Sequence, residues 1–145
     1  NNKWGYTFEF PPDGWEAEVF VTNDGWPEDV IKEGLMVHGP QHASIIIDVF
    51  TNESKLDLRT WFDKNQLPLI SESAVINFRD KAATTGLPAI TVNEPETIQT
   101  FGGPVTVFLY EDRVFRVSYN PAGYDKNIPV HRKVLDSCVP FTIKR

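Results

Sequence analysis

Two histidines and an aspartate give this sequence its clearest arrangement for holding a metal ion. His38 and His42 are separated by a Gly-Pro-Gln triplet, a spacing typical of a loop. Such a loop brings two imidazoles near one cation, with Asp48 or Asp24 as an oxygen ligand. Two histidines in a turn are also common without a metal, and no Cys or paired Glu completes the ligand set. The pattern therefore leaves a metal-dependent hydrolase around His38 and His42 as an alternative function.

Cys138 and His131 form a second candidate pair, a thiol and an imidazole near the end of a predicted helix. Their separation corresponds to about two helical turns, so both side chains lie on a similar side, where a histidine can activate a thiol nucleophile. The negative end of the helix dipole works against a thiolate at Cys138. We therefore predict a buried, unreactive thiol and no catalytic residue.

Asp48 is a carboxylate in a segment, Ala43 to Phe50, that is otherwise apolar on both faces. This pattern is expected of a central strand covered on both sides. A carboxylate there must reach solvent or find a donor. Arg79 and Arg116 lie on neighbouring predicted strands, and either can supply a guanidinium. The pattern favours a structural ion pair over a catalytic acid.

Three aromatic residues, Trp4, Trp26 and Tyr124, lie in predicted loops or near the start of the chain. An aromatic face in such a setting can stack on a sugar ring or cap an apolar groove of a partner. Packing against a neighbouring proline, as in Trp26-Pro27, is the alternative. These three residues are the candidates for a small-ligand or carbohydrate-binding module.

Composition limits the remaining classes of function. The 145 residues are 41% hydrophobic, which suits one globular domain spanning residues 1–145. The formal net charge of −6 argues against nucleic-acid binding. A single cysteine precludes an internal disulfide, and no phosphate-binding loop opens a helix, so we predict no cofactor. Asn52-Glu53-Ser54 matches a glycosylation sequon, a triplet that is common by chance.

Hydrophobic periodicity predicts strands connected mainly by hairpins, together with two helices. Leu58, Trp61 and Phe62 share one helical stripe, which Ser54 or Asp57 can cap. Because hairpins dominate, we expect an α+β fold with a central, mostly antiparallel β-sheet packed by two main helices. The predicted strands cover residues 6–10, 15–21, 43–50, 74–79, 87–93, 105–110, 114–119 and 139–143, the helices cover residues 58–66 and 128–137, and an acidic loop covers residues 23–34.

Two of these strands carry more specific expectations. In the second strand Trp15, Ala17, Val19 and Val21 share one face, with Glu16 and Glu18 on the other. The last strand begins at a proline, which predicts a position at the edge of the sheet. No window approaches the roughly 18 consecutive apolar residues needed to span a bilayer.

Four segments in order resemble small bacterial extracytoplasmic proteins with the PsbP-like α/β fold. The opening WGYTFEFPPDGW at residues 4–15 resembles the start of those proteins, and residues 56–62 resemble their first helix. Residues 112–119 resemble one of their strands, and residues 134–143 their closing helix and strand. The resemblance implies an α/β/α sandwich in an exported or lipid-tethered domain. Photosynthetic members bind a membrane protein complex from its lumenal side, so a protein partner is also implied.

Together these observations favour a noncatalytic, extracytoplasmic interaction or accessory domain, tethered at a membrane or part of a membrane-associated complex. We expect a protein partner and a secreted, periplasmic or lipid-anchored location. The chain starts at Asn1 without an initiator Met, from which we expect a targeting segment upstream of it. The carbohydrate-binding module and the metal-dependent hydrolase are the alternatives.

Overall fold

The computed structural model describes residues 5–11, 13–20, 31–40, 43–82, 85–94, 103–120 and 128–143. No helix within these ranges is long and apolar enough to cross a membrane. The elements, in chain order, are β1 (Tyr6–Thr7), β2 (Glu16–Phe20), β3 (Ile31–His38), β4 (Ser44–Thr51), α1 (Leu58–Asn65), the 3-10 helix η2 (Leu67–Leu69), β5 (Val75–Lys81), β6 (Pro88–Glu94), β7 (Gly103–Tyr110), β8 (Arg113–Asn120), α2 (Ile128–Ser137) and β9 (Val139–Pro140).

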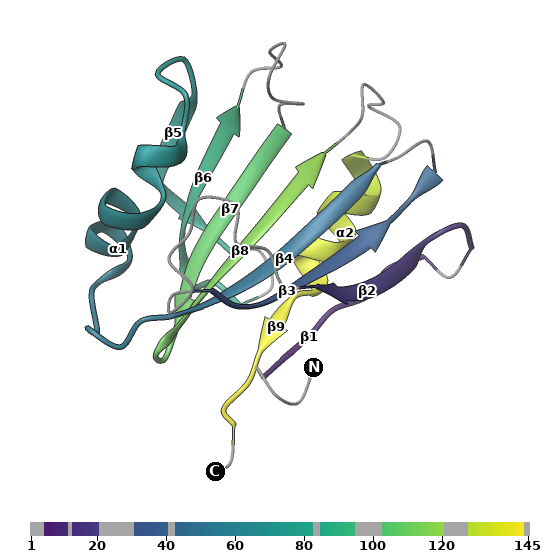
Figure 1. The fold of residues 1–145 in the computed structure, drawn as a ribbon, viewed down its shortest axis with the longest axis horizontal. Helices are drawn as coiled ribbons and strands as arrows, with labels where there is room; N and C mark the ends of the chain where they lie inside the picture. Colours follow the sequence, from purple (N-terminus) through teal and green to yellow (C-terminus); the bar gives the residue numbers. More distant parts are fainter. Residues whose placement is uncertain are drawn as a thin grey trace.

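Seven strands form one sheet in the order β2-β3-β4-β8-β7-β6-β5 (Figure 1). Every pairing in this sheet is antiparallel, and β5–β6 and β7–β8 are the two hairpins that the sequence predicts. β4 lies inside the sheet between β3 and β8, as its two apolar faces indicate. The predicted α+β class with an antiparallel sheet is therefore confirmed.

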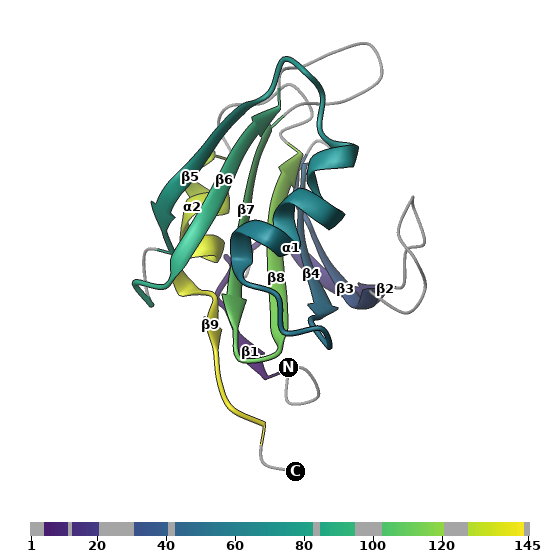
Figure 2. The same ribbon diagram turned by 90° about the vertical axis from the view of Figure 1, so that its left-hand side faces the viewer.

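Each face of the sheet has its own hydrophobic core, because side chains alternate along the strands. On β4, Ile45, Ile47 and Val49 belong to the core under α2, whereas Phe50 belongs to the core under α1. Figure 2 shows the two helices on opposite sides of the sheet. The arrangement is the helix–sheet–helix layering expected from the resemblance.

Helix α1 follows the prediction closely. Asp57 is its N-cap, and its carboxylate accepts a hydrogen bond from the Thr60 N–H at 3.0 Å. Trp61 and Phe62 are the buried residues of the predicted stripe. The helix ends at Asn65, three residues before Pro68, which opens the next short helix.

The second strand was predicted to share Trp15, Ala17 and Val19 on one face, and of these Trp15 alone is buried. Ala17 is exposed, and Val19 is 61% exposed. Alternation therefore predicts the strand correctly but not the burial of its side chains, because β2 is the last strand of the sheet.

The predicted acidic loop over residues 23–34 is wrong at its C-terminal end, where β3 begins at Ile31. Pairing with β4 stabilises this polar segment, and the register shifts between Ile31 and Glu33. Gly34 continues the strand opposite Asp48. Residues 21–30 lie outside the described part of the chain.

The terminal strands were also predicted incorrectly. Residues 6–10 and 139–143 contribute just two residues each, β1 and β9, which pair with each other in a separate two-stranded sheet. The Glu9 N–H instead donates to the Ser137 hydroxyl on α2 at 2.7 Å. Pro140 is buried opposite Tyr6, and β1 is the one partner of β9 among the described strands, so the predicted edge position is confirmed, at the edge of the small sheet.

Candidate functional site

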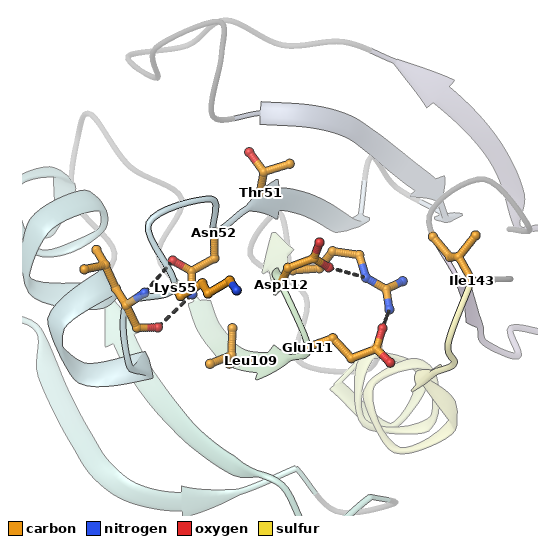
Figure 3. Close-up of a pocket in the computed structure, with 9 residues that line it drawn as sticks. Thr51, Asn52, Lys55, Leu109, Glu111, Asp112 and Ile143 are labelled. Carbon is orange, nitrogen blue, oxygen red and sulfur yellow. Dashed lines mark hydrogen bonds and ion pairs between the residues drawn. The ribbon is translucent and has the colours of Figure 1, made fainter. Parts of the chain in front are cut away.

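A hollow of about 570 Å³ opens at one end of the seven-stranded sheet (Figure 3). Its walls come from three segments that are far apart in the sequence: the loop between β4 and α1, the β7–β8 turn, and the segment after β9. Its shape therefore depends on how each loop is held. The lining residues are Thr51, Asn52, Lys55, Leu56, Leu109, Glu111, Asp112, Arg113 and Ile143.

Asn52 holds the loop between β4 and α1. Its side chain is buried, donates from Nδ2 to the Leu56 carbonyl at 2.7 Å, and accepts from the Leu56 N–H at 3.0 Å. Its backbone N–H donates to the Asp112 carbonyl at 2.8 Å, which ties this loop to the β7–β8 turn. The amide nitrogen of the predicted sequon is thus engaged inside the protein, where it is not an accessible glycosylation acceptor.

Lys55 and Glu111 line the hollow from two different loops, and both have an unusual backbone conformation. Their φ angles are 50° and 55°, and in the described part of the chain they are the two non-glycine residues with positive φ. Such a conformation costs on the order of 1 kcal/mol or more and persists where the surroundings enforce it. Residues of this kind concentrate at functional sites, so their shared position marks the hollow as the candidate site.

Arg113 holds the β7–β8 turn, which forms the second wall of the hollow. This residue is buried, with 4% of its surface exposed. Its guanidinium donates to the Glu111 carboxylate at 2.9 Å and to the Phe141 carbonyl at 3.1 Å. Glu111 in turn accepts a hydrogen bond from the Thr142 hydroxyl at 2.6 Å. The β7–β8 turn and the segment after β9 are therefore clamped together by one buried cation.

Several polar side chains of this hollow have structural roles. Its lining combines the charged residues Lys55, Glu111, Asp112 and Arg113 with polar Thr51 and Asn52. The polar atoms of Asn52, Glu111 and Arg113 are engaged in holding the loops. Lys55 is exposed and lines the same hollow as apolar Leu109 and Ile143.

The two predicted metal ligands that the structure describes, His38 and Asp48, lie far apart along the sheet. His38 is half exposed and lies 3.0 Å from the Glu18 carboxylate. It is opposite Ser44, and Asp48 is four residues further along β4, or about 13 Å away at the usual rise of a strand. His42 lies outside the described residues. Within the described ranges, no group of three or more His, Cys, Asp or Glu residues is placed to hold a metal ion.

Asp48 instead forms the structural ion pair that the sequence predicts, with Arg116 on β8 as its partner. Arg116 donates from Nε at 2.8 Å and from a terminal nitrogen at 2.5 Å, both to Oδ2. Burial raises the pKa of the Asp48 carboxyl, and the charge and hydrogen bonds of Arg116 oppose that shift. The other candidate, Arg79, lies on the edge strand β5.

His131 and Cys138 do not form a reactive pair. Burial lowers the pKa of His131 from 6.5 to about 4, with a smaller contribution from Arg132. Burial raises the pKa of the Cys138 thiol to about 12. Burial disfavours both the thiolate of Cys138 and the imidazolium of His131. Cys138 is a buried free thiol, as predicted.

We predict that His131 makes the protein less stable in acid. Its imidazole stacks on Tyr119, with ring centroids 5.0 Å apart, and its buried Nε2 has no partner among the described residues. In the unfolded chain the His131 imidazole has a pKa near 6.5, whereas in the folded protein its pKa is about 4. The stabilising contribution is therefore complete above pH 6.5 and is lost as the pH falls toward 4, by about 3 kcal/mol.

Urea unfolding at pH 7.5 and 4.5 measures this effect. His131→Phe keeps an aromatic ring against Tyr119 and is expected to flatten the pH dependence. Equal slopes for the original protein and His131→Phe would contradict the assignment.

We also predict that Cys138 resists thiol reagents in the folded protein. A pKa raised from 9.0 to about 12 reduces the thiolate fraction about 1,000-fold at neutral pH, and burial hinders access further. Labelling by a chromogenic disulfide at pH 8 should be at least about 1,000-fold slower in buffer than in urea. Comparable rates in the two conditions would place the thiol at the surface.

Trp4, Trp26 and Tyr124, the predicted ligand-binding aromatics, all lie outside the described residues. Sequence reasoning missed the hollow and its holding residues, Asn52, Glu111 and Arg113. The one available signal was the short connection at residues 111–113, which indicated a tight turn but not the contacts of its side chains.

The fold and the hollow define a class of protein: an α+β domain whose antiparallel sheet is packed by helices on both faces. The structure is similar to the solution structure of cyanobacterial PsbP (CyanoP) from Synechocystis sp. PCC 6803, with a TM-score of 0.60 and 14% sequence identity. The match covers 97% of this chain and 89% of that chain. No family model and no curated protein sequence matches this chain. The likeness shows a PsbP-like fold.

Proposed function

We propose that the protein is a noncatalytic accessory domain that works outside the cytoplasm and binds a protein partner at a membrane-associated complex. One observation carries the proposal: the polar atoms of Asn52, Glu111 and Arg113 hold three loops together, so these groups shape a surface. The PsbP-like fold supports an accessory role by analogy.

The proposed contact point is the rim of the hollow. Lys55 and the acidic turn of Glu111 and Asp112 line the same hollow as apolar Leu109 and Ile143, so the rim carries both signs of charge as well as apolar side chains (Figure 3). Such mixed patches are typical of interfaces in which charge sets the orientation and apolar contact supplies affinity. The two positive-φ residues fix the shape of this rim before a partner arrives, which lowers the cost of ordering it.

Site-specific crosslinking tests the proposal. A photoreactive group at position 55 is expected to capture a defined partner from native membranes of the source organism. The same group at Lys81, an exposed residue of β5, is the control and is expected to capture none. No adduct at position 55, together with turnover of ester, phosphate or glycoside substrates that follows the purified protein, would overturn the noncatalytic role.

Cell fractionation tests the location separately. The protein made from its natural gene is expected in the extracytoplasmic or membrane fraction, accessible to protease in intact spheroplasts. Protection from protease until the cells are lysed would contradict an extracytoplasmic location.

A further inference from the structure

The two edges of the seven-stranded sheet are built differently. β5 is irregular: its register with β6 shifts between Asn77 and Asp80, and it carries exposed Arg79 and Lys81. Bulges and exposed positive charges are the devices that keep an edge strand from pairing with other chains. This edge is therefore protected.

The opposite edge, β2, lacks these devices. It pairs with β3 in an unbroken register from Glu16 opposite His38 to Phe20 opposite Gly34. Its sequence, EAEVF, contains no Pro, Lys or Arg. Among the described strands, β3 is its one neighbour. Alternate residues of β2 consequently direct their backbone N–H and C=O groups outward from the sheet.

Within the described ranges, both faces of β2 carry exposed side chains. The Glu18 side chain is 63% exposed on one face, and Val19 is 61% exposed on the other. Figure 1 shows β2 at the far side of the sheet from α1, which packs on β6 and β7. Among the residues that the structure describes, an incoming strand therefore meets β2 with its outer backbone groups unpaired to another strand and with exposed side chains on both faces.

We propose that the β2 edge accepts an added β-strand from a partner protein, in which Lys or Arg residues alternate with apolar residues. The backbone groups of β2 supply the hydrogen bonds, and the alternation supplies the selectivity. Lys or Arg would lie opposite Glu16 and Glu18, and apolar residues opposite Ala17 and Val19. This inference rests on the proposed function, because it names the kind of segment that the partner contributes.

Charge favours a cationic partner strand over a second copy of this chain at the β2 edge. Two β2 strands that pair around a two-fold axis with the fullest overlap place Glu18 opposite Glu18 of the second copy. Like charges directly opposite each other on paired strands are destabilising. The net charge of −6 adds a general repulsion between copies and attracts a cationic segment.

Peptide binding followed by NMR tests the inference. The probe is a capped seven-residue peptide of alternating Lys and Val, and its counterpart alternates Glu and Val. The Lys/Val peptide is expected to shift the amide resonances of β2 and β3 and to slow hydrogen exchange at alternate residues of β2. Shifts confined to other elements, or no shifts at millimolar peptide, would overturn the inference.

Charge reversal provides the matched comparison. Glu16→Lys with Glu18→Lys is expected to weaken binding of the Lys/Val peptide about tenfold and to create binding of the Glu/Val peptide, because the charge opposite the peptide is reversed. Both side chains are exposed, so the fold tolerates the substitutions. Arg79→Glu on the β5 edge is the control and should leave binding at β2 unchanged. An unchanged preference in the reversed variant would overturn the inference, as would shifts at β2 that depend on protein concentration alone.

These outcomes are distinguishable from failure of the proposed function. A partner captured at position 55 without peptide binding at β2 would remove the strand-addition inference and leave the accessory role. Substrate turnover with intact peptide binding would remove the noncatalytic role and leave the edge as a binding site.

Discussion

Replacing Arg116 by leucine is expected to destabilise the protein by about 3 to 5 kcal/mol at pH 7, because it leaves the Asp48 carboxylate buried without its cation. Asp48 is 1% exposed, and its Oδ1 atom already has no hydrogen-bond partner among the described residues. Without Arg116, the pKa of Asp48 rises further. The loss should therefore be smaller in acid, where the carboxyl is protonated, and should grow as the pH rises.

The double variant Asp48→Leu with Arg116→Leu shows how much of the stability loss in Arg116→Leu comes from the unpaired Asp48 charge and how much from the lost contacts of Arg116. Both residues lie on the α1 face, where Arg116 also approaches the ring of Phe50. Two apolar side chains suit that environment, so the double variant is expected to recover most of the stability lost in Arg116→Leu. Urea unfolding at pH 7 and pH 5 measures all three proteins. A double variant less stable than Arg116→Leu would show that the pair contributes a large net stabilisation.

Replacing Gly5 by alanine is expected to cost about 3 to 5 kcal/mol, since two penalties combine. Gly5 has a φ of 67°, which disfavours any residue with a Cβ atom. A Cβ atom there would lie 2.5 Å from the Phe141 carbonyl oxygen and 2.9 Å from Ile143, and it would press on the Arg113 guanidinium. The substitution should therefore loosen the clamp that closes the hollow.

Gly86 is a matched control for this substitution. Its φ is 66°, and a Cβ atom there would meet no atom within 4 Å. Gly86→Ala is therefore expected to cost about 1 to 2 kcal/mol, from the backbone conformation alone. Thermal or urea unfolding of the two variants compares them directly. Equal losses would mean that the crowding around Gly5 relaxes without cost.

Local patterns explain which parts of the fold could be predicted. The β7–β8 and β5–β6 hairpins and helix α1 depend on residues close together in the sequence, such as Asp57 and the stripe of Trp61 and Phe62. The ion pair at Asp48 was predictable because a charge in an apolar strand requires a partner on a neighbouring strand. The fold class followed from these elements.

Contacts between distant segments explain what could not be predicted. β3 carries a polar start and a glycine, and it becomes a strand through its pairing with β4. The hollow needs Asn52, Arg113 and Phe141 to meet from three separate parts of the chain. The sequence around each of these residues does not indicate which distant residue it contacts, so the candidate site could be found only in the structure.

The pairing of β1 with β9 has a consequence for how the protein is made. Tyr6, which is fully buried, has its strand partner at Pro140, so the first strand cannot pair until the chain has been synthesised past that residue. This makes the pairing of β1 with β9 a late folding step.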